Sequence, residues 1–120
     1  MVLFRFRKTE PQVKSFKNKF AFEKCIAESG EQVVVVDFNA HWCPPCKYFD
    51  PTFQKLSREY DHIIFKRCSV EQDGDNPCHK GVTLDAFPTF KFYKNGKEMA
   101  EDCFEGANEQ KLRERLKKHS

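Results

Sequence analysis

Two cysteines, Cys43 and Cys46, are the residues of this 120-residue chain best suited to chemistry. They stand where an apolar, β-branched run gives way to a predicted helix, so the first sulfur should lie at the helix start and the second one turn inside. The positive end of the helix dipole favours an anion there, and the thiolate is the nucleophilic form of cysteine. We therefore predict that Cys43 attacks a substrate disulfide and that Cys46 resolves the mixed disulfide. We also expect Cys46 to be the more buried of the two.

The two residues between the cysteines are Pro44 and Pro45. Proline suits the first positions of a helix because an amide there would have no intrahelical partner. The prolines also remove backbone donors near Cys43, which leaves mainly the amides of Cys46 and Lys47. We expect weaker stabilisation of a thiolate than a glycine at position 44 would allow.

The elements that must position this pair alternate between strands and helices. The uncharged apolar run at 33–36 predicts a central strand covered on both faces, and Asn95-Gly96 predicts a hairpin turn. The pattern predicts an α/β fold with helices on both faces of one sheet. The expected elements are strands at 13–17, 33–38, 63–70, 89–93 and near 99–104, helices at 18–29, 44–60 and from 108, and a loop or short helix at 71–84.

Length and composition exclude several classes of protein. A chain of 120 residues with thirteen Phe fits one domain with a single core, and a net charge of +3 does not by itself indicate nucleic-acid binding. No apolar run is long enough to span a membrane, and no secretory signal is evident, so we expect a cytoplasmic protein. We assign residues 1–12 to an N-terminal extension, either an edge strand or a frayed tail, and residues 13–120 to the domain.

Four further cysteines accompany the pair. Without an export signal, six cysteines at irregular spacing favour reduced thiols plus one catalytic pair. We interpret Cys25, Cys68, Cys78 and Cys103 as small core hydrophobes or idle thiols. Cys78, which precedes His79 in a polar loop, is the candidate for regulation. A zinc site built from that loop and the pair would need four converging ligands, so we expect no metal.

Several segments resemble the thioredoxin family, and together they cover roughly residues 13–118. They are VDFNAHWCPPCK at 36–47, FPT at 87–89, which is similar to the family's cis-proline loop, KNGK at 94–97 and GA at 106–107. The resemblance implies a thioredoxin fold, with a central mixed sheet flanked by helices, over 13–120. It also implies a monomer that reduces protein disulfides, binds no cofactor, and receives electrons from NADPH through thioredoxin reductase.

The resemblance also assigns roles around the pair. Asp37 becomes a buried acid that acts through water as the base for Cys46; the alternative is a strand-end carboxylate that caps the next turn. Arg67 falls near this acid, with a plain surface charge as its alternative. The substrate-binding surface is expected to comprise Trp42, Pro44, Phe87, Pro88, Gly106 and Ala107. Core packing for Phe87 and a simple turn for Gly106 are the competing interpretations.

The chain departs from the family at position 44, where thioredoxins usually carry Gly. A CPPC pair is similar to that of tryparedoxins and nucleoredoxins, which leaves the reducing partner open. An oxidase or isomerase is disfavoured because no oxidising compartment is indicated. The alternative outside catalysis is a redox-sensing module that holds a protein partner on the same apolar surface.

Overall fold

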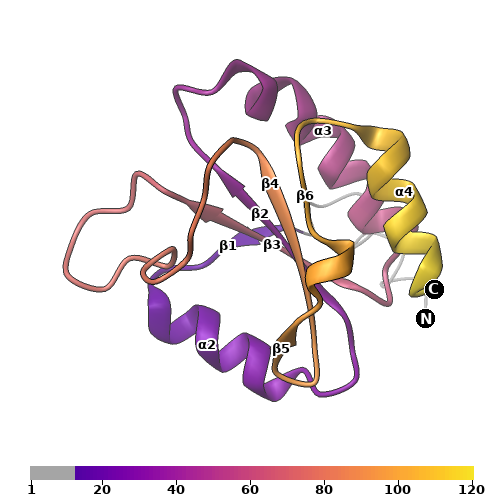
Figure 1. Ribbon diagram of the computed structural model, residues 1–120, viewed down its shortest axis with the longest axis horizontal. Helices are drawn as coiled ribbons and strands as arrows, with labels where there is room; N and C mark the ends of the chain where they lie inside the picture. The colour runs from indigo at the N-terminus through magenta and orange to yellow at the C-terminus, as the bar shows by residue number, and fades with distance from the viewer. Residues whose placement is uncertain (1–12) are drawn as a thin grey trace, which may run out of the picture.

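Strand β2, Val34–Asn39, is the centre of the sheet in the computed structural model, which describes residues 13–120. Its three valines are fully buried, as expected for an apolar run covered on both faces. Strand β3, Ile64–Ser69, pairs with β2 in parallel, and β4, Thr89–Lys94, pairs with its other edge antiparallel. The predicted mixed sheet is therefore confirmed (Figure 1).

Three short strands extend the sheet within residues 13–120, and the edge strand or frayed tail predicted at 1–12 lies outside the described residues. They are β1 at Lys14–Ser15, β5 at Lys97–Glu98 and β6 at Phe104–Glu105, and the sheet order is β1-β3-β2-β4-β5 with β6 also paired to β4. The β4–β5 hairpin turns at Asn95 and Gly96, which have φ values of 55° and 76°. These positive angles are what the predicted Asn-Gly hairpin turn requires.

The strand predicted near 99–104 is wrong, because a 3₁₀ turn, η1 at Ala100–Asp102, interrupts it. Asp102 is only 1% exposed, and its carboxylate accepts hydrogen bonds from Lys118 at 2.7 Å and from the His119 ring at 2.8 Å. Burial alone would raise the pKa of Asp102, but these two partners lower it. In a continuous strand, the Asp102 carboxylate would not lie buried beside the C-terminal end of the last helix.

Helices cover the two faces of the sheet (Figure 1). Helix α2, Lys19–Glu28, lies on one face, where its Phe22 packs with Val34 and Val36. Helices α3, Pro44–Glu59, and α4, Glu109–Lys118, lie on the other face. Asn18 and Asn108 cap α2 and α4 by accepting hydrogen bonds from backbone amides, each at 2.9 Å. The helices predicted at these positions are confirmed.

The connection at 70–88 forms turns and no helix. The Gln72 side chain ties it down, since its oxygen accepts a hydrogen bond from the Cys78 amide at 2.7 Å and its nitrogen donates to the Phe16 carbonyl. The connection ends at a cis peptide bond between Phe87 and Pro88. No helix within residues 13–120 has the length and apolar character that crossing a bilayer requires.

The aromatic core on the α3 side provides a test of the fold. Phe53 is fully buried between Phe65 and Phe90, with ring centroids 5.1 and 5.6 Å away. We expect Phe53→Ala to lower the free energy of unfolding by about 3–5 kcal/mol, measured by denaturant titration, because it leaves a cavity. Phe20→Ala is the matched control, since Phe20 is 74% exposed and its loss should cost at most about 0.5 kcal/mol. Equal losses in the two variants would contradict this packing.

Candidate active site

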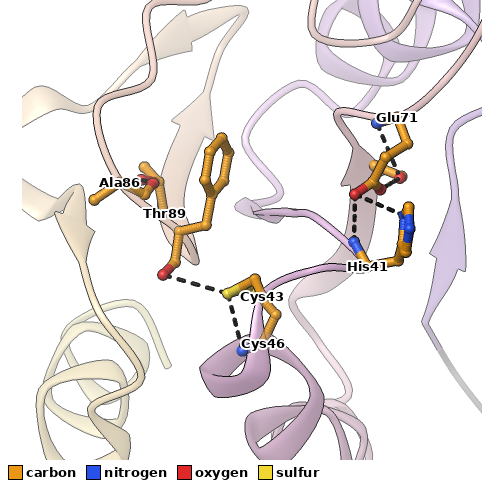
Figure 2. The surroundings of a disulfide bond; sticks show 8 residues. His41, Cys43, Cys46, Glu71, Ala86 and Thr89 are labelled. Atoms are coloured by element: carbon orange, nitrogen blue, oxygen red, sulfur yellow. Dashed lines mark hydrogen bonds and ion pairs between the residues drawn. A yellow bond between two sulfur atoms is a disulfide. The ribbon is translucent and has the colours of Figure 1, made fainter.

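The pair Cys43 and Cys46 forms a disulfide at the start of α3, with the two Cα atoms 5.3 Å apart. Cys43 is the N-cap residue, and its sulfur accepts a hydrogen bond from the Cys46 amide at 3.3 Å (Figure 2). Pro44 and Pro45 occupy the first helical turn. The predicted placement of the sulfurs at the helix start is confirmed, and the site can undergo thiol–disulfide exchange.

Two expectations about this turn are wrong. Cys46 is not the more buried cysteine, because Cys43 is 5% exposed and Cys46 is 7% exposed. Phe87 packs against the pair from another loop, and its carbonyl oxygen lies 3.6 Å from the Cys43 sulfur. The Lys47 amide donates to the Cys43 carbonyl at 3.3 Å rather than to the sulfur, so among residues 13–120 the Cys46 amide is the one backbone donor to that sulfur.

The turn at Phe87 and Pro88 faces the cysteine pair. Its predicted cis peptide bond is confirmed, and the Thr89 hydroxyl donates to the Ala86 carbonyl across the turn at 2.6 Å. The Gly106 amide donates to the Pro88 carbonyl at 2.8 Å, which attaches the turn to the segment before α4. Pro88 is buried and Phe87 is half-buried, so Phe87 is the more accessible of the two.

Aromatic side chains form the surface beside the pair. Trp42 is 61% exposed and packs edge-on against Phe87, with ring centroids 5.5 Å apart. A shallow hollow of about 270 Å³ adjoins it, lined by His41, Trp42, Pro44, Lys47 and Tyr48. Tyr48, which is 83% exposed, was not predicted from the sequence as part of this surface. The pattern of α3 places it on the solvent face, the one signal that was available for it.

Of the other predicted surface residues, Gly106 is half-buried and Ala107 is exposed. Gly106 is attached to the cis turn by its hydrogen bond, so it lies beside the site. Ala107 follows it directly in the chain. The expected residues therefore gather at one end of the sheet, although only Trp42 and Phe87 contact each other through their rings.

Asp37 is a carboxylate in the middle of β2, 3% exposed, and its Oδ1 has no hydrogen-bond partner within residues 13–120. Desolvation raises its pKa from 3.8 to about 7, and the nearby Arg67 charge opposes that rise. Because side chains alternate along a strand, Asp37 shares its face with Val35, under α3. A carboxylate in mid-strand does not cap the next turn, so that alternative is wrong.

Arg67 lies opposite Asp37 in the pairing of β2 with β3. Its guanidinium forms an ion pair with Asp50 of α3, and it lines the same hollow as Cys46. Arg67 is therefore not an isolated surface charge. It lowers the pKa of Asp37 without removing the larger effect of desolvation.

Glu71 is a further residue beside the site, and it was not predicted from the sequence. Its carboxylate accepts a hydrogen bond from the His41 amide at 2.5 Å and lies 2.9 Å from the His41 ring nitrogen (Figure 2). Burial by itself would raise the pKa of Glu71, but hydrogen bonds from the Ser69 hydroxyl and the His41 amide lower it, and the net shift is downward. Parallel strands end at the same sheet edge, so an acid just after β3 could have been expected beside the residues that follow β2.

The interpretation of Cys68 and Cys78 as unpaired thiols is wrong. They form a second disulfide, with Cα atoms 6.0 Å apart and both residues fully buried. The connection after β3 folds back over the sheet, which brings together residues ten positions apart. Cys25 and Cys103 are unpaired and half-buried, and burial raises the pKa of both thiols.

A family model, curated relatives and solved structures that are similar to this chain all belong to one family. The family model described as Thioredoxin matches residues 12–118. A thioredoxin of Gallus gallus is 43% identical over 105 residues, covering 88% of this chain and 96% of its own. The structure of Fasciola hepatica thioredoxin superposes with a TM-score of 0.80 at 36% identity, covering 89% and 99% of the two chains. A thioredoxin f2 structure, in complex with ferredoxin:thioredoxin reductase, has a TM-score of 0.80 at 28% identity, covering 90% and 94%.

The raised pKa of Asp37 predicts a specific pH dependence of stability. Between pH 3.8 and about pH 7, Asp37 holds a proton in the folded chain that it releases in the unfolded chain. The free energy of unfolding therefore falls as the pH rises through this range. Asp37→Asn removes this term. We expect the free energy of unfolding of the variant, relative to that of wild type, to rise by about 4 kcal/mol from pH 4 to pH 8, measured by denaturant titration. Parallel pH profiles for the two proteins would contradict the raised pKa of this buried carboxyl group.

Proposed function

This chain belongs to the thioredoxin family, whose members are protein-disulfide oxidoreductases, and we propose that it reduces protein disulfides through Cys43 and Cys46. One observation carries the proposal. The Cys43 sulfur lies at the N-terminus of α3, 3.6 Å from the carbonyl of Phe87, whose ring packs against the exposed Trp42 ring. A nucleophile and a peptide-docking edge thus lie together.

Cys43 is the attacking residue and Cys46 the resolving residue in the proposed cycle. The Cys43 thiolate bonds to one sulfur of the substrate disulfide, whose S–S bond breaks, and the departing sulfur takes a proton. Cys46 then loses its proton and attacks the Cys43 sulfur, which releases the second substrate thiol. The substrate gains two electrons, and the chain is left with the Cys43–Cys46 disulfide.

Asp37 is the proposed proton acceptor for Cys46, acting through water. A carboxyl group with a pKa of about 7 can hold or release a proton near neutral pH, which an ordinary aspartate with a pKa of 3.8 does not. Its position under α3 supports this role, because Arg67 and Asp50 connect its surroundings to the hollow that Cys46 lines. Arg67 is a positioning residue that tunes this carboxyl group.

Docking of the substrate is proposed at the turn that carries Phe87 and Pro88. An extended peptide beside this turn can pair with its backbone and rest on the ring of Trp42, which requires little particular sequence in the client. Pro44, Gly106 and Ala107 complete the proposed surface. Core packing alone does not account for Phe87, because it is half-buried and joins the exposed Trp42 ring.

The electron donor is proposed to be NADPH acting through a thioredoxin reductase, with no cofactor bound to this chain. The similar thioredoxin f2 whose structure is a complex with ferredoxin:thioredoxin reductase supports a reductase partner of this general kind. We further propose a monomer that acts in the cytoplasm as part of an electron-transfer chain. Pro44, which replaces the usual Gly, is the position at which the reductase preference of this chain would differ.

Insulin reduction tests the reductase assignment. Wild type should accelerate disulfide reduction when driven by dithiothreitol, and also when driven by NADPH with thioredoxin reductase. Cys43→Ser should fall to the rate without protein in both assays, because the nucleophile is lost. Cys25→Ser is the matched control and should retain the wild-type rate. Turnover with dithiothreitol alone would contradict the proposed donor, and no turnover would contradict the reductase assignment itself.

Trapping tests the separate roles of the two cysteines. Cys46→Ser should accumulate mixed disulfides between Cys43 and client proteins, because the resolving thiol is absent. Non-reducing electrophoresis of the purified variant with a disulfide-bonded client would reveal them, and dithiothreitol should release them. A redox-sensing binding module would instead hold its partner without a covalent bond, so noncovalent capture alone would favour that alternative.

A further inference from the structure

A second cluster of reactive side chains lies away from the proposed active site. Cys68 and Cys78 are fully buried, and their sulfurs and one ring nitrogen of His79 all lie within 4.8 Å of one another. The cluster sits on the α2 face of the sheet, where Phe22 and Val36 pack beside the two cysteines, whereas α3 covers the opposite face. The proposed reductase cycle uses none of the three.

His79 carries an unused polar group. Its Nδ1 is buried and has no hydrogen-bond partner within residues 13–120. A buried polar atom without a partner costs free energy and requires an explanation, and a bound ion is one that the neighbouring sulfurs make specific here. Two cysteine sulfurs and one imidazole nitrogen are the donor set that Zn²⁺ favours.

The loop around this cluster is held in place by bonds that do not involve the disulfide. The Cys78 amide donates to the Gln72 side chain at 2.7 Å, and Gln72 in turn donates to the Phe16 carbonyl. The Lys19 amide at the start of α2 donates to the Asn76 carbonyl at 2.9 Å. Cys68 is itself fixed in β3. Reduction of the disulfide therefore leaves both sulfurs close to each other and to the His79 ring.

We propose that Cys68, Cys78 and His79 bind a Zn²⁺ ion when the disulfide between the two cysteines is reduced. A dithiol or phosphine reductant supplies two electrons to the S–S bond, which becomes two thiols with two protons from solvent, and the reductant is oxidised. Zn²⁺ then bonds to both sulfurs and to the imidazole nitrogen, while the two thiol protons leave to solvent. The disulfide and the zinc site are two mutually exclusive states of one cluster.

The geometry needs only small adjustment. Zinc bonds of about 2.3 Å to sulfur and about 2.0 Å to nitrogen place tetrahedral ligands about 3.5–3.8 Å apart, within the present spread of the cluster. The two sulfurs must separate from bonding distance. His79 is only half-buried, so water can reach the fourth position. The connection at 70–88 would thus be tethered to β3 in both states, by a disulfide under oxidising conditions and by an ion under reducing conditions.

The test uses the full-length variant Cys43→Ser/Cys46→Ser, because the first pair would otherwise compete for the ion. The reduced, chelator-treated protein is titrated with Zn²⁺ against a chromophoric chelator, and with Co²⁺ for its thiolate-to-metal absorption band. We expect one ion per chain. In the same background His79→Ala should weaken binding by about 10- to 100-fold or more, and Cys68→Ser should abolish stoichiometric binding. Bound zinc should also block reoxidation to the Cys68–Cys78 disulfide, as read by thiol alkylation and mass spectrometry.

Cys103→Ser in the same background is the matched control, since this thiol is unpaired and lies outside the cluster, and it should bind zinc normally. Circular dichroism checks that each variant is folded. His79→Ala keeps the buried sulfurs, so it tests the site even if Cys68→Ser fails to fold. The proposal is overturned if the reduced background variant binds no stoichiometric ion, or if His79→Ala binds Zn²⁺ as tightly as its parent. The insulin assay on wild type tests the proposed function independently of the zinc titration. A failure of the zinc site can therefore be distinguished from a failure of the reductase assignment.

Discussion

The burial of β2 on both faces is the constraint on which the rest of the structure depends. Its valines are fully excluded from water, so the strand has to lie between two layers of helices, with a strand hydrogen-bonded along each edge. The parallel neighbour β3 needs a crossover, which α3 supplies, and α3 must therefore begin at the end of β2. The cysteine pair lies at that junction.

The same arrangement assembles the site from distant segments. Because β2 and β3 are parallel, the residues after both strands emerge at one edge, where Glu71 meets His41. The antiparallel β4 starts at this edge, so the turn before it brings Phe87 to Cys43. The hydrogen bond from the Gly106 amide adds the segment before α4. The directions of β2, β3 and β4, more than any one contact, place these side chains at the same edge of the sheet.

The two faces of the sheet give ionisable and sulfur-bearing groups different chemistry. Asp37 faces α3, and desolvation there keeps its pKa near neutrality despite the charge of Arg67. Cys68 lies in the α2 layer, where it is joined to Cys78 and both side chains are fully buried. The first pair lies at the helix start beside the exposed Trp42 and keeps a small exposed fraction, 5% for Cys43 and 7% for Cys46, whereas the second pair is fully buried. Position in the layers therefore separates two disulfides of the same chemical type.

Local signals in the sequence determine the helix starts at Asn18 and Asn108, the Asn95-Gly96 turn, the buried central strand and the placement of Cys43 at a helix start. Each depends on residues within one turn or one strand, so tertiary structure has little to overrule. The contact of Glu71 with His41 and the Cys68–Cys78 bond join residues 30 and 10 positions apart. The 3₁₀ turn η1, which interrupts the strand predicted near 99–104, is accompanied by the contacts of buried Asp102 with Lys118 and His119. Only the folded chain decides these features, because each partner is defined by how strands and layers meet in space.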